Sequence, residues 1–387
     1  LLTIEKQHVF NPAAVGVLGI SLLSPEHVAT WWIGNPIMMP FVVIGGFLLV
    51  RRIRKEAMVY PFLVIYIIAI LVAALSRSAS IQTFMSALDV AFLKSPGWFL
   101  GFVMLTEPLT APARKRPQYV YAVFVALLTA TAQMRSVFVS FTPEEALCIG
   151  NIAAYMMSPR KRLVLALQEK IEITKDTIQY IFRPLEPVSF KPGQYMEWTL
   201  PHLKMDSRGN RRHFSLLSAP NAEQLAIAVK FYDKPSSYKQ SLRELKVGQE
   251  IIAANLGGDF TLPRGFEKKK LAFIAGGIGI TPFISMLEHI IVEQKKCDIT
   301  MLYSLKTIND AGFVEVIEKA RQYGVNTVYN IGTLEESMIQ KEVPDYVERM
   351  WYISGPQLMV QAFEKKLGDM AISKRNIITD YFPGFAG

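Results

Sequence analysis

The stretch Leu271-Ala-Phe-Ile-Ala-Gly-Gly-Ile-Gly-Ile-Thr-Pro-Phe-Ile-Ser285 decides the fold of the second half of the chain. Its apolar run predicts a buried strand, and the glycines and the proline that follow predict a tight turn before a helix. Such a turn brings bare backbone N–H groups toward a pyrophosphate, because glycine has no Cβ atom and a helix N-terminus favours negative charge. The residues expected around this dinucleotide site are Gly276, Gly277, Gly279, Thr281 and Pro282.

The composition places the main domain boundary near residue 158. The chain has 387 residues, a formal charge of +9 and 51% hydrophobic residues, and the hydrophobic excess is concentrated in residues 1–158. The positive charge does not predict nucleic-acid binding, because the basic residues cluster at the ends of apolar segments. Cys148 and Cys297 are too few for an iron–sulfur cluster or a redox pair, so no metal site is expected. Because the chain begins at Leu1, we expect a piece of a longer protein.

The first 158 residues predict a membrane domain of about six spans. The candidate apolar segments are residues 12–23, 33–50, 58–75, 98–111, 119–134 and 145–157. Several are shorter than the roughly 20 residues of a straight span, so re-entrant or discontinuous helices are expected among them. With the N-terminal end inside, 11 basic residues fall on the inner side and 3 on the outer side. This asymmetry predicts a multi-pass protein of the cell (inner) membrane, in contact with the lipid bilayer, whose second half is cytoplasmic.

Residues 159–387 predict two further domains. Between 159 and 265, short alternating apolar runs are separated by Pro and Gly turns, which predicts a six-stranded antiparallel barrel. Between 266 and 387, apolar runs alternate with helical stretches, which predicts a parallel sheet with right-handed crossovers. The expected fold is a multi-domain membrane protein with an α-helical transmembrane bundle at 1–158, an antiparallel β-barrel domain at 159–265 and an α/β parallel-sheet domain at 266–387.

Motifs in the barrel resemble the ferredoxin–NADP reductase superfamily. Pro192-Gly193-Gln194-Tyr195 is similar to the family's turn before the flavin site, and Arg212-His213-Phe214-Ser215 is similar to its Arg-x-Tyr/Phe-Ser signature. The resemblance implies FAD here, with its pyrophosphate at a guanidinium whose planar shape suits phosphate. By the same match, Phe214 lies against the isoalloxazine and Ser215 near its N5. Ser237 would cap a helix and donate to phosphate, or act only as the N-cap. The implied FAD-binding residues are Tyr195, Arg212, His213, Phe214, Ser215, Ser236 and Ser237.

The same resemblance implies that the last domain binds NADH or NADPH. Ser354-Gly355-Pro356 is similar to the family's Cys-Gly-Pro beside the nicotinamide, with Ser in place of Cys. The C-terminal aromatics resemble a residue that stacks on the flavin, with Phe382 as the first candidate and Phe385 as the second. Lys306 either contacts a 2′-phosphate or faces solvent, so both nucleotides stay open. The implied catalytic residues are Ser215, Ser354 and Phe382. The implied nucleotide contacts are the glycine turn with Thr281 and Pro282, then Lys306, Gly355 and Pro356.

Short motifs in the first half resemble the B subunit of the sodium-pumping NADH:quinone reductase and the D subunit of the Rnf complex. They lie at residues 10–14, 45–54, 104–110 and 150–153. In that family the membrane subunit carries flavin attached through phosphate to Thr in a Ser-Gly-Ala-Thr sequence, which this chain lacks. The resemblance implies a second flavin (FMN), bound without a covalent link, or a quinone site. Further membrane subunits are implied as partners.

These features predict a membrane-bound flavoprotein that takes hydride from NAD(P)H to FAD and passes electrons to a membrane-embedded flavin or quinone. The alternative is a redox-driven ion-translocating subunit or transporter with a fused reductase domain. A haem-containing transmembrane reductase is disfavoured, because the only histidines before residue 200, His8 and His27, cannot form two stacked bis-histidine sites. A passive anchor is also disfavoured, because a single span would be enough for it.

Overall fold

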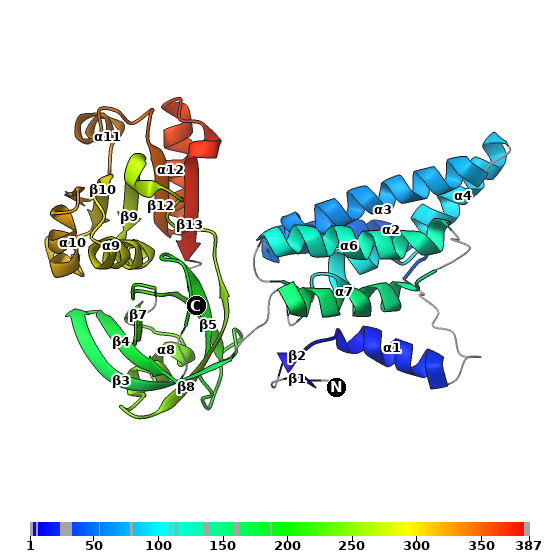
Figure 1. Cartoon of the computed structure of the whole chain (residues 1–387), viewed down its shortest axis with the longest axis horizontal. Helices are drawn as coiled ribbons and strands as arrows, with labels where there is room; N and C mark the ends of the chain where they lie inside the picture. Colours follow the sequence, from blue (N-terminus) through cyan, green and yellow to red (C-terminus); the bar gives the residue numbers. More distant parts are fainter. Residues whose placement is uncertain are drawn as a thin grey trace. The chain divides into compact units, whose positions relative to one another are not determined.

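A computed structural model describes residues 3–4, 7–23, 33–53, 55–77, 80–108, 110–112, 115–134, 140–157, 162–185, 188–220 and 222–382 (Figure 1). The chain divides into two compact units, Leu1–Lys161 and Arg162–Gly387. The second unit contains a barrel and a parallel sheet, and the first contains the apolar helices.

The barrel is a six-stranded antiparallel sheet in the order β6-β5-β8-β3-β4-β7. Its strands are β3 (Leu163–Thr174), β4 (Thr177–Pro184), β5 (Tyr195–Thr199), β6 (Arg211–Ser215), β7 (Leu225–Lys230) and β8 (Glu250–Gly257), with helix α8 (Ser237–Glu244) after β7. Burial alternates along the first half of β3, as expected for a strand with one face on a core. Trp198, Tyr180 and Phe182 are fully buried in that core. The predicted barrel is therefore confirmed.

The nucleotide domain is a five-stranded parallel sheet in the order β11-β10-β9-β12-β13. The strands are β9 (Lys270–Gly276), β10 (Asp298–Leu305), β11 (Val325–Ile331), β12 (Met350–Pro356) and β13 (Ile377–Phe382); the helices are α9 (Thr281–Glu293), α10 (Val314–Arg321), α11 (Glu336–Glu342) and α12 (Gln357–Asp369). Short 3-10 turns are η2 (Phe266–Lys268), η3 (Gly277–Ile280), η4 (Ile308–Asp310) and η5 (Lys374–Asn376). The parallel sheet is confirmed, and the strand order reverses between β9 and β12, where sheets of this kind bind ligands.

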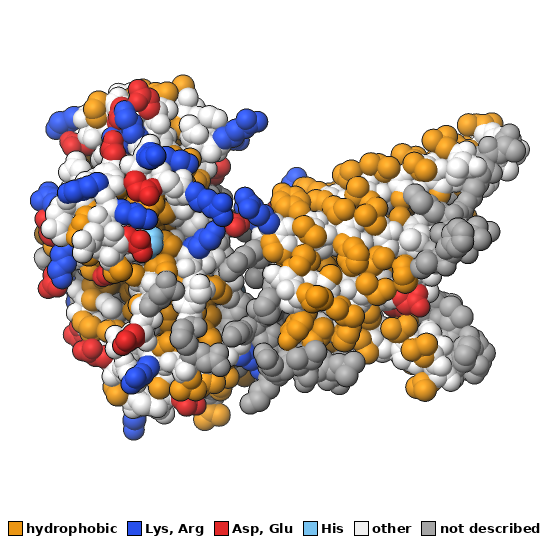
Figure 2. Space-filling model, viewed as in Figure 1, with side chains coloured by type: hydrophobic (Ala, Val, Ile, Leu, Met, Phe, Trp, Pro, Cys, Tyr) orange, Lys and Arg blue, Asp and Glu red, His pale blue; other side chains and the backbone are white. Residues whose placement is uncertain are grey.

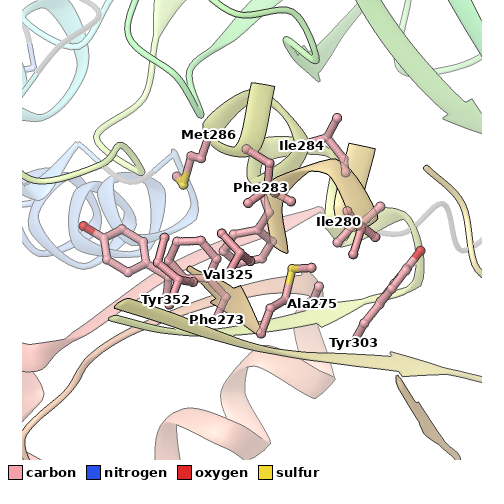
Figure 3. Close-up of a cluster of buried hydrophobic side chains, with 14 of the residues drawn as sticks. Phe273, Ala275, Ile280, Phe283, Ile284, Met286, Tyr303, Val325 and Tyr352 are labelled. Atoms are coloured by element: carbon pink, nitrogen blue, oxygen red, sulfur yellow. The ribbon is translucent and has the colours of Figure 1, made fainter. Parts of the chain in front are cut away.

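Helices cover both faces of this sheet. Helices α9 and α10 pack on one face in a cluster that also contains barrel residues Leu217 and Phe260, whereas α11 and α12 pack on the other. Figure 3 shows the first cluster, in which the rings of Phe273 and Phe283 stack with centroids 4.6 Å apart. Ser285 Oγ also donates to the Ser218 carbonyl at 2.8 Å. Barrel and sheet therefore meet through a shared hydrophobic cluster, beside the barrel's own core.

The first unit is built from short and long apolar helices. They are α1 (Pro12–Leu23), α2 (Met39–Ile53), α3 (Glu56–Arg77), α4 (Ile81–Leu93), α5 (Gly97–Phe99), the π-helix η1 (Leu100–Met104), α6 (Lys115–Met134) and α7 (Pro143–Met157), with a small β1 (Thr3–Ile4) and β2 (Gln7–His8) pair. Within the described ranges, one helix, Glu56–Ser76, is long and apolar enough to cross a membrane, and half of its apolar window is buried. The six-span bundle stays a prediction, because most of these helices are shorter than a straight span.

A buried polar junction joins distant parts of this unit. The Asn11 N–H donates to Asn151 Oδ1 at 2.8 Å, and Asn151 Nδ2 donates to the Tyr121 hydroxyl at 3.0 Å. Asn11 Oδ1 accepts from the backbone N–H groups of Ala13 and Ala14, so it caps α1. Two asparagines that lie in separate sequence motifs therefore form one contact, although 140 positions separate them.

Candidate functional site

A tight turn positions the start of β5. Gly193 has φ +93°, and a Cβ at this position would lie 2.2 Å from the carbonyl oxygen of Phe260. Gln194 closes the turn by accepting the Lys191 N–H at its Oε1 at 2.8 Å, and its Nε2 ties the turn to the Gly258 carbonyl at 3.1 Å. Only glycine fits this conformation and this space. The turn sets the register in which Tyr195 faces Ser215 across the β5–β6 ladder.

Strand β6 sorts the four signature residues onto two faces. Arg212 and Phe214 both contact the Tyr238 ring, with the guanidinium carbon 5.1 Å and the Phe214 ring 6.0 Å from its centroid. His213 points the other way, with a side chain 58% exposed, and its ring meets Tyr195 edge-on at 5.4 Å. The structure thus brings Arg212 and Phe214 together and separates His213 from them, as the alternation of a strand requires.

Both terminal nitrogens of the Arg212 guanidinium already donate to groups of the protein. Its Nη2 donates to both carboxylate oxygens of Asp206, at 2.9 and 3.1 Å. Its Nη1 donates to the carbonyls of Arg208, Gly209 and Arg211 at 2.7–3.0 Å. The side chain is only 8% exposed.

The N-terminus of α8 holds the two serines assigned to the FAD phosphates. Ser236 is the N-cap and accepts from the Lys239 N–H, so the expected cap at Ser237 is wrong by one residue. Ser237 Oγ instead accepts from the Asp206 N–H at 3.0 Å and lies 3.0 Å from His202 Nε2. Ser236 has the extended backbone of a cap residue, whereas Ser237 is already the first helical residue.

Positive charges gather near Arg212 at this end of the barrel: Arg208 and Lys239 both lie close enough to repel it, and Asp206 pairs with it. Burial, together with repulsion from Arg208 and Arg212, lowers the pKa of Lys239 to about 8. Burial opposes ionisation of Asp206, but the Arg208 N–H and the Arg212 guanidinium outweigh it and lower the pKa of the carboxyl. The excess of positive charge suits a doubly charged pyrophosphate.

The glycine turn after β9 presents bare backbone. Gly277 has φ +52°, and a Cβ there would meet no atom within 4 Å, so the space beside its Cα is open. A Cβ on Gly279 would lie 2.3 Å from the carbonyl oxygen of Ser354 and 2.5 Å from Gly355 Cα. Thr281 is buried, and its Oγ1 donates to the Ile278 carbonyl at 3.1 Å. Pro282 stands in the first turn of α9. The turn is thus pressed against the end of β12 at the edge predicted for the nucleotide.

Two assigned serines carry buried hydroxyls that have no protein partner among the described residues. Ser354 is fully buried and Ser215 is 4% exposed, and neither Oγ makes a hydrogen bond. A buried hydroxyl left unpaired costs free energy, so such groups point to a ligand that pairs with them. This fits polar edges of a flavin and a nicotinamide beside them.

The remaining candidates lie at the rim. Phe382 is half-buried at the end of the edge strand β13, in register with Pro356 on β12. Lys306 is exposed just after β10, which leaves the choice between NADH and NADPH open. Phe385 lies outside the described residues.

The loop that covers Arg212 was not predicted from the sequence. Two residues of this loop contact the side chains assigned to the FAD phosphates: Asp206 bonds to Arg212, and His202 bonds to Ser237. The charges of Arg208 and Lys239 act on Arg212. The signal that was available is the density of basic residues around the Arg212 motif, at positions 204, 208, 211 and 239. No sequence signal paired Asp206 with Arg212.

Comparison with known proteins supports the assignment of the second unit. The family described as "Oxidoreductase NAD-binding domain" matches residues 273–365. Flavohemoprotein A of Dictyostelium discoideum is 25% identical over 56% of this chain and 59% of its own length. The reductase component of propane 2-monooxygenase from Rhodococcus jostii is 27% identical over 54% of this chain and 60% of its own length. The chain thus spans about three fifths of these relatives.

Solved structures share the fold. The cytochrome P450 reductase GcoB of Amycolatopsis superposes with a TM-score of 0.53 and 21% identity, over 58% of this chain and 71% of that chain. The flavohemoglobin of Malassezia yamatoensis superposes with a TM-score of 0.54 and 19% identity, over 89% of this chain and 98% of that chain. These structures show the same fold, and the family match and the curated relatives support a ferredoxin reductase-like FAD- and NAD-binding oxidoreductase domain in the second unit.

Proposed function

We propose that this protein oxidises NAD(P)H with FAD in its second unit and passes the electrons to an acceptor outside that unit. The supporting observation is that two adjoining domains carry the two groups of residues that this reaction needs. The barrel has a cluster of cations, and the parallel sheet has a glycine turn where its strand order reverses. FAD, when bound, supplies the exchange between two-electron and one-electron chemistry.

The chain itself binds, orients and shields. Arg212 and the α8 N-terminus would bind the FAD pyrophosphate, while Gly276, Gly277 and Gly279 would bind that of NAD(P)H. The buried hydroxyls of Ser215 and Ser354 would pair with polar ring edges and fix their orientation. The hydrophobic cluster that joins barrel and sheet would keep water out behind them. No side chain has to move a proton for hydride to pass.

The test is the flavin content and reduction of the purified 387-residue chain. We expect one releasable FAD, bleached under anaerobic conditions by NADH, by NADPH or by both. Arg212→Ala should lower FAD occupancy, and Ser354→Ala should slow bleaching at full occupancy. A wild-type chain that holds no FAD when supplied in excess, or whose FAD is not bleached by either nucleotide, would overturn the proposal.

We further propose that the acceptor is embedded in a membrane and that the helical unit holds it. Large apolar side chains stand exposed along α2, α3 and α6, including Phe41, Ile44, Leu48, Val64, Ile68, Val72, Leu75, Val120 and Leu127. Figure 2 shows this concentration of hydrophobic side chains on the helical unit. Exposed apolar area on this scale is unusual in a water-facing surface.

In this proposal the protein crosses the cell (inner) membrane several times, and its second unit is cytoplasmic. The acceptor is a quinone or FMN, and further membrane subunits are partners. Reconstituted protein should reduce a quinone analogue with NADH faster in liposomes than after removal of residues 1–161. A second flavin left after FAD release would identify FMN instead. If the protein reduces a water-soluble protein acceptor efficiently and no quinone, the membrane acceptor is refuted. That outcome would match the relatives that are named as reductase components of oxygenases.

Redox-driven ion translocation is the alternative that the same liposomes test. The buried junction of Asn11, Asn151 and Tyr121 is a polar site within apolar helices, as ion-translocating units often have. Charge movement that depends on sodium or protons during NADH turnover would support it, and turnover without charge movement would exclude it.

A further inference from the structure

The phosphate-binding groups of the barrel are covered by a loop of the same barrel. Residues 200–210 connect β5 to β6, and their carbonyls and the Asp206 carboxylate take nearly every hydrogen bond that Arg212 makes. The Arg212 side chain is 8% exposed as a result. A pyrophosphate therefore cannot reach this guanidinium unless part of the loop moves.

The same loop also occupies the neighbouring helix start. The Asp206 N–H donates to Ser237 Oγ at 3.0 Å, and His202 Nε2 lies 3.0 Å from the same oxygen. His202 Nδ1 is 2.8 Å from the Leu200 carbonyl, so a neutral ring would donate there and accept from the Ser237 hydroxyl. Asp206 thus engages two of the side chains assigned to the FAD phosphates, Arg212 through its carboxylate and Ser237 through its backbone.

We propose that Asp206 takes the place of a pyrophosphate oxygen in the flavin-free protein, and that FAD binds after the loop of residues 201–210 lifts off Arg212 and Ser237. This inference rests on the proposed function, because it assumes that FAD uses Arg212. A carboxylate and a phosphate both accept paired hydrogen bonds from a guanidinium, so the two compete for the same donors. Once displaced, the Asp206 carboxylate would be hydrated by solvent.

The loop is built so that it can lift without unfolding the barrel. Its tip buries little, since Leu203 is 92% and Met205 is 55% exposed. Lys204 and Gly209 have φ of 55° and 66°, so the chain reverses within the loop itself. The Gly209 N–H donates to the Asp206 carbonyl at 2.9 Å, which keeps the reversal intact. Segments with few buried contacts open at low free-energy cost.

The charges favour exchange of one anion for another. Lys239 and Arg208 add two positive charges beside Arg212, and Asp206 supplies one negative charge. A pyrophosphate carries more negative charge than a carboxylate and would balance the cluster better. The opposing reading is that Asp206 stays in place and only orients Arg212 toward FAD. The two readings predict opposite effects of removing the carboxylate.

The experiment is a titration of the full-length, flavin-stripped protein with FAD and with riboflavin, followed by quenching of flavin fluorescence. For Asp206→Asn we expect a Kd for FAD about tenfold lower than in the wild type. A difference of this size corresponds to a wild type in which the loop is open in about one flavin-free molecule in ten. The Kd for riboflavin, which has no pyrophosphate, should not change. Asp176→Asn is the matched control, because Asp176 pairs with Lys230 at 3.0 Å elsewhere on the barrel, and it should leave both Kd values unchanged.

The outcomes separate this inference from the proposed function. If Arg212→Ala weakens FAD binding while Asp206→Asn leaves it unchanged or weakens it too, competition by Asp206 is refuted and the flavin site stands. If Arg212→Ala leaves the Kd for FAD unchanged, the flavin-site assignment fails as well. Tryptic cleavage of the wild type gives an independent readout: FAD should speed cleavage after Lys204 and Arg208, and protection of these sites by FAD would overturn the proposal.

Discussion

Replacing Gly279 by alanine tests the construction of the nucleotide site most directly. The added Cβ would lie 2.3 Å from the Ser354 carbonyl oxygen, 2.5 Å from Gly355 Cα and 2.6 Å from Gly355 N. All three are backbone atoms of β12, which lies inside the sheet between β9 and β13, so no side-chain rotation relieves the contact. The turn or the strand end must move by roughly 1 Å, and overpacking of this kind costs about 1–3 kcal/mol.

That displacement should act on rate more than on folding. A shift of about 1 Å between reacting groups can lower a rate about 100-fold. We therefore expect kcat for NAD(P)H-dependent ferricyanide reduction to fall about 100-fold in Gly279→Ala, with FAD content unchanged, because the barrel has its own core. The assay is steady-state kinetics alongside flavin stoichiometry and thermal unfolding.

The matched control is Gly248→Ala. Gly248 has φ +85° in a barrel turn, and a Cβ there would meet no atom within 4 Å. This variant bears a backbone strain of about 1 kcal/mol without a steric clash. It should keep the wild-type kcat. If Gly279→Ala retains the wild-type kcat, or if Gly248→Ala loses as much, the close approach of turn and strand does not set the rate, and the reasoning fails.

Three further predictions follow from the same structure. Since the pKa of Lys239 is lowered to about 8 and a bound pyrophosphate would raise it, FAD binding should take up a proton above that pH. FAD affinity in titrations should then fall as pH rises from 8 to 10, by up to about tenfold per unit, and Lys239→Met should remove this dependence. Phe382→Ala should change the KM for NAD(P)H more than FAD retention; if both stay unchanged, the stacking role moves to Phe385. Arg349→Met should lower the free energy of unfolding in urea by about 3 kcal/mol, because the Arg349 side chain is only 9% exposed where it pairs with Asp345. Arg321→Met, at an exposed pair, should cost under about 0.5 kcal/mol.

The sequence predicted best the features that are encoded locally. The β9 strand, the glycine turn and α9 follow from fifteen consecutive residues, because burial, turn conformation and helix start each leave a signal there. Helix α11 was not predicted, since its seven residues are too few for a helical period to show. Strand β13 was read only as a terminal aromatic segment, although it pairs with β12 through Phe382.

What the sequence could not predict depends on distant or irregular backbone. Asp206 is only six positions from Arg212, but their contact depends on left-handed conformations at Lys204 and Gly209. Lysine rarely adopts that conformation, so its residue type gave no warning. The Asn11–Asn151 bond joins α1 to α7, and nothing in either local pattern specifies that pairing. Interactions set by tertiary packing override local preference in such places.

The two nucleotide half-sites are built by different physical means, and this difference is itself testable. On the barrel, the proposed binding of FAD depends on charge. Arg212, Arg208 and Lys239 would attract the pyrophosphate, and the Asp206 carboxylate competes with it for the Arg212 donors. A defect in charge weakens affinity, so added FAD should restore the activity of Arg212→Ala. On the sheet, the site depends on the close approach of Gly279 to Gly355. A steric defect there persists in the saturated complex, so no concentration of NAD(P)H should restore the rate of Gly279→Ala. Recovery of Gly279→Ala at high nucleotide concentration would mean that the turn controls affinity alone, and that orientation for hydride transfer is set elsewhere.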